Sequence, residues 1–144
     1  GGTGIMMIST KGRYALRVMI DLAERGEGRY VPLAEIAERQ NISEKYLESI
    51  LVVLSRAGFL QALRGKGGGY RLTRRPEEYT ADEIVCLAEG TLAPVYCMKD
   101  GESCERAGIC QTRPMWEGLD RAITDYLRRW TLADLARGAQ EPSR

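Results

Sequence analysis

The sequence of 144 residues contains no histidine. Without an imidazole it cannot form the Ser-His-Asp constellation of a hydrolase, and no paired catalytic carboxylates stand out. No apolar run reaches the roughly 18 residues that a membrane span needs. The glycine-rich stretch "RGKGGGY" (64–70) lacks the order of a phosphate-binding P-loop, because its lysine precedes the run of three glycines and no helix N-terminus is expected after it. We therefore expect neither an enzyme nor a membrane partner.

Charge is divided unevenly along the chain, although the net charge is only +1. Residues 11–75 hold thirteen Lys and Arg against seven Asp and Glu, whereas residues 76–144 hold eight against thirteen. The stretch 60–75 carries five basic residues and no acidic residue. A basic first half followed by an acidic second half predicts a polyanionic partner for the first half alone.

The spacing of apolar residues predicts mainly helices in the first half. Helices are expected over 11–25, 32–40 and 44–58, and the last two are separated by the short corner "NIS" (41–43). The stretch 59–73 alternates, turns through glycines and alternates again, as a β-hairpin does. A helix-turn-helix followed by a basic hairpin is the pattern of a winged-helix DNA-binding domain, whose second helix enters the major groove.

The second half predicts a helix over 81–90, a long helix over 112–130 and a short helix over 131–138. Apolar residues of the long helix repeat at spacings of three and four: Trp116, Leu119, Ile123, Leu127 and Trp130. This seam is larger than a C-terminal helix needs for packing within one small domain. It therefore predicts a coiled-coil-like homodimer interface.

Three of the four cysteines, Cys97, Cys104 and Cys110, lie within fourteen residues. We expect a cytosolic protein, in which clustered cysteines more often indicate metal or redox chemistry than a disulfide scaffold. Gaps of six and five residues let the chain wrap around an object larger than one ion, whereas zinc sites favour tighter pairs. An iron–sulfur cluster is therefore favoured over zinc, thiol redox sensing or no functional role. The fourth cysteine, Cys86, is predicted to be a buried structural thiol of the helix over 81–90.

Five stretches of the sequence together resemble those of a known protein family: "ISTKGRYALRVMIDLA", "LAEIAERQNISEKYLESIL", "RGKGGGYRL", "ADEIVCLAEG" and the cysteine loop that ends in "CQTRPMW". Over about residues 7–137 the chain resembles the bacterial winged-helix repressor family that includes IscR, NsrR and CymR. The resemblance implies a mainly helical fold with a small β-hairpin wing, and a homodimer with crossing C-terminal helices. The body is similar to the CymR branch, which lacks the cysteine loop, so the cysteines favour the IscR-type, cluster-binding members.

The resemblance also implies a ligand set. IscR-like proteins hold a 2Fe–2S cluster with three cysteines, here Cys97, Cys104 and Cys110, and a histidine three residues later. That histidine position is Arg113, and arginine stays protonated and cannot ligate. NsrR-like sensors use an aspartate from the partner's first helix, but that position is Arg13. The fourth ligand is left open between solvent and a local carboxylate: Asp100, Glu102, Glu105 or Glu117.

DNA contacts carried over from the family fall on the second helix of the helix-turn-helix and on the wing. Ser43, Lys45 and Glu48 would face bases, and Arg64 would reach the minor groove. Glu48 would select for cytosine, because a carboxylate accepts from cytosine N4. The alternative for each residue is a solvated helix face. The remaining expected DNA contacts are Tyr46, Lys66, Lys11 and Arg13.

The expected organisation has three parts. A winged helix-turn-helix domain occupies 7–79, a linker helix and cysteine loop occupy 80–112, and a dimerisation helix with a final short helix occupies 113–138. The expected function is a cytoplasmic, DNA-binding transcription repressor that senses iron–sulfur cluster status and controls iron–sulfur or cysteine metabolism genes. The alternatives are a nitric-oxide or thiol-redox sensor of the same family and a small electron-transfer iron–sulfur protein.

Overall fold

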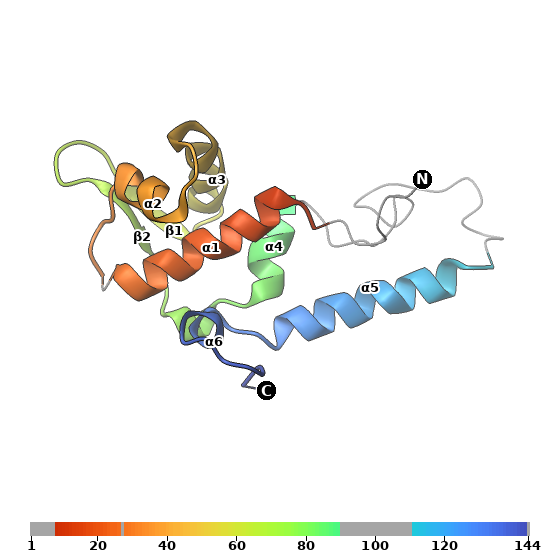
Figure 1. Cartoon of the computed structure of the whole chain (residues 1–144). Coiled ribbons are helices and arrows are strands. Elements are labelled where there is room, and N and C mark those ends of the chain that lie inside the picture. Colours follow the sequence, from red (N-terminus) through yellow and green to blue (C-terminus); the bar gives the residue numbers. More distant parts are fainter. Residues whose placement is uncertain (1–7, 27, 90–110, 144) are drawn as a thin grey trace.

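The computed structural model describes residues 8–26, 28–89 and 111–143 (Figure 1). In chain order its elements are α1 (Thr10–Arg25), α2 (Leu33–Gln40), α3 (Glu44–Arg56), β1 (Leu60–Leu63), β2 (Gly69–Leu72), the 3₁₀ helix η1 (Pro76–Glu78), α4 (Ala81–Glu89), α5 (Arg113–Arg128) and α6 (Leu132–Ala136). The predicted mainly helical architecture with one small hairpin is confirmed for these ranges. None of the described helices is long and apolar enough to cross a membrane.

The corner between α2 and α3 forms where the sequence predicts it. Asn41 adopts a left-handed φ of 54° and ends α2, a conformation that asparagine tolerates better than most residues. Ser43 is the N-cap of α3, because its side chain accepts the Tyr46 N–H at 3.2 Å. Gly58, with a φ of 83°, follows the end of α3 and turns the chain into the hairpin. The predicted helix-turn-helix is therefore confirmed, with α3 ending at Arg56.

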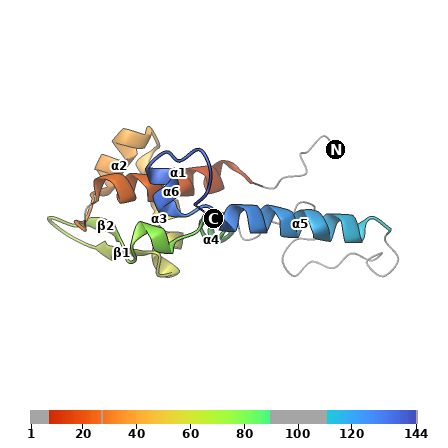
Figure 2. The same cartoon turned by 90° about the horizontal axis from the view of Figure 1, so that it is seen from below.

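The core lies between α1, α3 and α4, and the last helix of the chain belongs to it. Spacings of three and four place Leu47, Leu51 and Leu54 of α3 in this core. Leu132 of α6 is fully buried in the same cluster, and α6 packs against α1 (Figure 2). Thr131 caps α6, as its sequence predicts. The chain therefore returns to the winged-helix body after leaving it through α5.

The hairpin pairs β1 with β2 in antiparallel register, with Leu60 opposite Leu72. Val31, just before α2, extends this sheet by one bridge. Its N–H donates to the Tyr70 carbonyl at 2.8 Å, and the Tyr70 N–H donates back at 2.9 Å. Gly69 permits this approach, because its φ is 150° and a Cβ there would lie 2.2 Å from the Val31 carbonyl oxygen. The wing is thus attached directly to the start of the helix-turn-helix.

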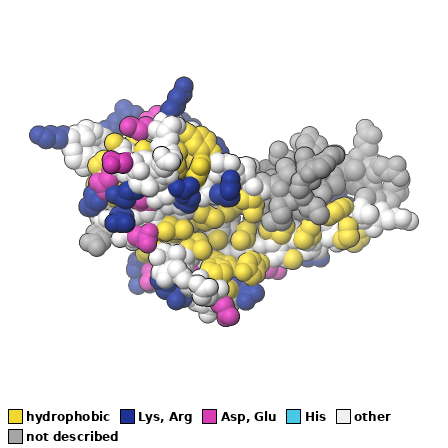
Figure 3. All heavy atoms as spheres, viewed as in Figure 1, with side chains coloured by type: hydrophobic (Ala, Val, Ile, Leu, Met, Phe, Trp, Pro, Cys, Tyr) yellow, Lys and Arg dark blue, Asp and Glu magenta, His cyan; other side chains and the backbone are white. Residues whose placement is uncertain are grey.

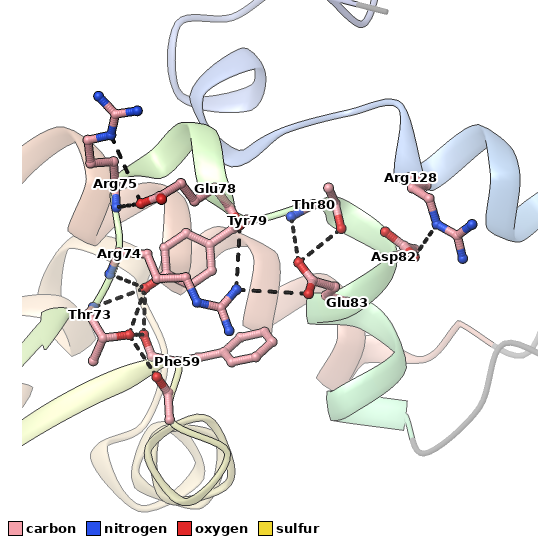
Figure 4. Close-up of polar contacts among 11 residues, drawn as sticks. Phe59, Thr73, Arg74, Arg75, Glu78, Tyr79, Thr80, Asp82, Glu83 and Arg128 are labelled. Atoms are coloured by element: carbon pink, nitrogen blue, oxygen red, sulfur yellow. Dashed lines mark hydrogen bonds and ion pairs between the residues drawn. The ribbon is translucent and has the colours of Figure 1, made fainter.

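Tyr79 lies at the base of the wing, beside Phe59 and Thr73 (Figure 4). Its ring is fully buried, and its hydroxyl donates to the Phe59 carbonyl at 2.7 Å. The same hydroxyl accepts the N–H groups of Thr73 at 3.0 Å and Arg74 at 3.1 Å. The Tyr79 carbonyl also accepts the Leu132 N–H at 2.9 Å. One residue therefore joins both ends of the hairpin to the segment that leads into α6.

Helix α5 extends from the body as an arm in both ribbon views (Figures 1 and 2). None of its residues is buried, yet hydrophobic side chains continue along it (Figure 3). Its base is fixed to the body, because the Ala81 N–H donates to the Trp130 carbonyl at 2.9 Å. The Arg128 guanidinium also lies 3.4 Å from the Asp82 carboxylate. The arm is thus anchored at its C-terminal end.

Candidate nucleic-acid interface

The start of α3 presents the polar face that the sequence predicts. Ser43, Lys45 and Glu48 are exposed, whereas Leu47 and Ile50 of the same helix are buried in the core. The exposed face follows from helical phase, since residues three and four apart share a side. Lysine and arginine side chains are also visible over the part of the surface formed by the helix-turn-helix and wing (Figure 3). The base contacts of these residues stay a prediction.

Tyr46 is half-buried. It belongs to a row of aromatic and arginine side chains in contact with one another, which the sequence did not reveal. Its ring meets the edge of Tyr14 on α1, with centroids 5.8 Å apart. The Arg17 guanidinium lies 4.8 Å from the Tyr14 ring centroid and donates to the Gln40 carbonyl at 2.6 Å. The row therefore ties α1 to the end of α2 and to the start of α3. Helical spacing could not find it, because its members lie on three helices.

A buried ion pair fixes α2 against α1. Asp21 is only 2% exposed and accepts from Arg39 at 2.7 and 3.0 Å and from Gln40 at 2.8 Å. Hydrogen bonds from Arg29 and Arg39 hold the pKa of Glu35 below its ordinary value, and those to Asp21 and Glu35 raise the pKa of Arg39. This charged network holds α2, and with it the orientation of α3.

The wing tip carries Arg64 and Lys66, both exposed as expected. Gly65 and Gly67 have φ of 91° and 79°, so the turn that projects these two cations needs residues without a Cβ. Arg71 is held differently, because its guanidinium lies 4.4 Å from the centroid of the Tyr30 ring. The wing therefore offers two cations at its tip and keeps Arg71 at its base.

A hollow of about 340 Å³ lies between the second half of α3 and the wing. Its lining includes Arg56 and Arg64, together with Leu63, which is 47% exposed. Burial raises the pKa of the Tyr70 hydroxyl at this place, the charge of Glu48 raises it further, and Arg64 opposes the shift. Because residues of α3 and of the wing line the same hollow, the two elements form one surface.

Six predicted or candidate cluster ligands lie outside the described residues: Cys97, Cys104, Cys110, Asp100, Glu102 and Glu105. In the parts that are described, no group of three or more Cys, Asp and Glu side chains could hold a metal ion. Arg113, at the expected histidine position, is the first residue of α5, and its Nε lies 3.4 Å from Glu117 Oε1. The one described candidate carboxylate is therefore paired with that arginine.

The prediction that Cys86 is a buried thiol is wrong. Helix α4 buries Ala81, Ile84 and Val85, whereas Cys86 is exposed. Each step along an α-helix turns by about 100°, so the residue after Val85 leaves the buried side. Apolar neighbours in the sequence therefore gave a misleading signal, because the buried stripe of a helix includes only some residues of an apolar run.

The predicted dimer residues are all half-buried. Trp116, Leu119, Ile123 and Leu127 belong to α5, whereas Trp130 follows the end of this helix at Arg128. An apolar hollow of about 390 Å³ opens beside them, between α5 and Ile8, which precedes the N-cap of α1. Tyr126, which also lines this hollow, is 50% exposed. The homodimer stays a prediction.

Comparisons with known proteins agree with this geometry. The family model named Rrf2, described as an iron-dependent transcriptional regulator, matches residues 8–138. The HTH-type transcriptional regulator IscR of Cereibacter sphaeroides is 38% identical over 142 residues, which cover 95% of this chain and 91% of that protein.

Solved structures extend the match to the fold. The structure of CymR, the global cysteine regulator of B. subtilis, has a TM-score of 0.73 at 38% identity and covers 92% of this chain and 98% of its own. The structure of T. potens IscR has a TM-score of 0.72 at 33% identity and covers 95% of this chain and 90% of its own. The predicted family of transcription regulators is confirmed, and the chain belongs to the Rrf2 family, whose model is described as an iron-dependent transcriptional regulator.

Proposed function

We propose that this protein is a homodimeric repressor whose binding to promoter DNA is set by an iron–sulfur cluster, most simply of the 2Fe–2S type. Family membership gives transcription regulation and DNA binding. The observation that carries the finer proposal is the group of Cys97, Cys104 and Cys110 in a chain that is 38% identical to an IscR. Control of iron–sulfur or cysteine metabolism genes is the corresponding proposal for its targets.

Three cysteine side chains have the donor chemistry that an iron–sulfur cluster needs. Cys97, Cys104 and Cys110 would hold it, since thiolates are the usual ligands of iron–sulfur clusters. Arg113 cannot be the fourth ligand, because a guanidinium has no free lone pair and this one lies 3.4 Å from Glu117. A carboxylate or solvent would complete the set. A bound cluster supplies a redox-active group whose presence follows the iron and oxidant status of the cell.

The residues of α3 and the wing would read DNA together. Ser43 and Lys45 would contact bases or phosphates from the start of α3, and Glu48 would accept from cytosine N4. Arg64 and Lys66 would reach phosphates or the minor groove from the wing tip. The excess of basic residues in the first half suits this role, because neutralised phosphates supply most of the affinity for DNA.

The half-buried seam on α5 supports the homodimer. An arm with no buried residue leaves Trp116, Leu119 and Ile123 partly in water, and pairing two arms would remove this apolar surface. Helix-turn-helix dimers read two half-sites whose spacing the dimer sets. Leu119→Asp is expected to give monomers in sedimentation analysis, whereas the exposed-site control Arg121→Asp is expected to leave dimers. If both variants remain dimeric, the result contradicts this interface.

The deciding experiment combines an absorption spectrum with DNA binding. Protein purified without oxygen is expected to be reddish-brown, and its affinity for promoter fragments is expected to depend on salt and to change when the cluster is removed. A colourless protein with stoichiometric zinc would overturn the cluster. Affinity that changes on thiol oxidation without any cluster would make the protein a thiol-redox regulator. Binding no stronger than background would favour the electron carrier instead.

A further inference from the structure

The carboxylate of Glu89 binds the start of α1. Ser9, the N-cap of α1, donates its backbone N–H to Oε2 of Glu89 and its hydroxyl to Oε1 at 2.6 Å. The same hydroxyl oxygen accepts the Lys11 N–H at 3.2 Å. Glu89 is the last residue of α4 and lies 80 positions from Ser9 in the sequence. One carboxylate therefore joins the end of α4 to the beginning of α1.

The residues around this carboxylate leave room for it and complement its charge. Gly12 is buried, and a Cβ at this position would lie 3.1 Å from Glu89 Oε2 and 3.2 Å from its Cγ and Cδ. The first turn of α1 has no acidic residue, so Glu89 supplies the negative charge that stabilises a helix N-terminus. The Glu89 side chain therefore packs against Gly12 and accepts hydrogen bonds from the N-cap residue Ser9.

Three features of the chain adjoin this contact, one of them in the sequence and two in the structure. Glu89 directly precedes residues 90–110, which contain the three predicted cluster ligands. Lys11 and Arg13, two of the expected DNA contacts, lie in the helical turn that the contact begins. Ile8, one residue earlier, lines the apolar hollow beside α5. Helix α1 in turn holds the helix-turn-helix through its buried ion pair with α2.

We propose that Glu89 is a positioning residue through which the cysteine segment controls DNA affinity. The proposal rests on the proposed function, because it names the route by which cluster occupancy reaches the DNA-binding surface. While Glu89 holds Ser9, the first turn of α1 is capped and Lys11 and Arg13 have fixed places relative to α3. A displacement of the end of α4 withdraws the carboxylate, and the turn loses its charge partner and frays.

Glu89→Gln tests this route, because an amide keeps the shape of the side chain but removes its charge and one of its two accepting oxygens. Affinity for a promoter fragment is measured with and without the cluster at one salt concentration. Coupling between sites is commonly about 5- to 150-fold, and in the variant we expect the two affinities to converge to within about twofold. Amide hydrogen exchange over the first turn of α1 should rise in the state in which wild-type Glu89 holds Ser9, so that the two states of the variant exchange at similar rates.

Glu83→Gln is the matched control. Glu83 is also a carboxylate of α4, and its Oε2 accepts the N–H and the hydroxyl of Thr80, both at 3.1 Å (Figure 4). This contact closes the opposite end of α4, so its loss should leave the dependence on the cluster intact. Ser9→Thr, which keeps the hydroxyl, should retain the dependence, whereas Ser9→Ala should reduce it.

The outcomes separate the two proposals. A wild-type protein whose DNA affinity ignores the cluster would overturn the proposed function. A wild-type protein that responds, together with a Glu89→Gln variant that responds equally, would overturn only the role of Glu89. Should Glu89→Gln lose its colour or its fold, Gly12→Ala makes the same test from the α1 side. This variant crowds the carboxylate without changing its charge, and a full wild-type response in it would also overturn the proposal.

Discussion

The hydroxyl of Tyr79 allows a quantitative test of how the wing is held. Tyr79→Phe removes one oxygen from a fully buried ring and leaves the packing of the ring unchanged. Three backbone groups lose their hydrogen bond to this hydroxyl: the Phe59 carbonyl and the N–H groups of Thr73 and Arg74. These groups lie at the two ends of the hairpin, so the substitution acts on the attachment of the wing.

The expected cost follows from what can replace each bond. A hydrogen bond contributes about 0.5–1.5 kcal/mol net, and a buried group left unpaired costs about 1–3 kcal/mol. The Phe59 carbonyl keeps a bond from the Thr73 hydroxyl at 3.2 Å, and exposure of Thr73 lets water reach its N–H. The Arg74 N–H has the least compensation. We therefore expect the free energy of unfolding to fall by about 2–3 kcal/mol.

Urea unfolding followed by circular dichroism measures this loss, at one protomer concentration because the stability of an oligomer depends on it. The midpoint should fall and the slope should stay constant. Tyr30→Phe is the control, since among the described residues its hydroxyl makes no hydrogen bond and its ring remains under Arg71. The control should change stability by less than about 0.5 kcal/mol. Equal losses in both variants would refute this account of the wing base.

Three further predictions concern the cysteines, base recognition and acid stability. Cys104→Ala should abolish visible absorption and leave a folded dimer, whereas the exposed Cys86→Ala should keep the colour; retained colour in both would remove Cys104 from the ligand set. Glu48→Ala should change the ranking of operator variants in competition binding more than the total affinity, and a uniform loss would make Glu48 a structural residue. Hydrogen bonds from Ser143 and from the Thr131 N–H hold the pKa of Asp134 well below its ordinary value of 3.8. Asp134→Asn should therefore lower the midpoint of urea unfolding at pH 7, and the difference from wild type should shrink as the pH falls below 3.8, because the wild-type carboxylate then loses its advantage. A difference that does not depend on pH would contradict the role of the charge.

Local signals explain what the sequence could predict. The corner at Asn41 and the cap at Ser43 are decided by residues next to one another, and the alternation around the glycines specifies the hairpin. The ends of elements are less well specified, and α3 ends at Arg56, two residues before the predicted end. Cys86 shows a related limit, because apolar neighbours do not define the phase of a short helix.

Contacts between distant residues could not be predicted in the same way. Asp21 with Arg39 and Ser9 with Glu89 are joined only because helices pack, and no spacing within one helix encodes that packing. In the candidate site, the cysteine spacing favoured a cluster and the resemblance gave its ligand set. Arg113 marks where that inference ends, since its pairing with Glu117 is a property of α5 and not of the cysteine pattern.

The buried position of Leu132 has a consequence for how the protein is made. A ribosome completes the hairpin, α4 and the arm before α6, yet the core of the DNA-binding body contains Leu132. Truncating a buried leucine to alanine costs about 2–5 kcal/mol, so a nascent chain without α6 lacks a large share of its stability. We therefore expect a stable DNA-reading surface only on chains that already carry the arm, and we expect fragments from interrupted translation to bind operators more weakly than finished protein.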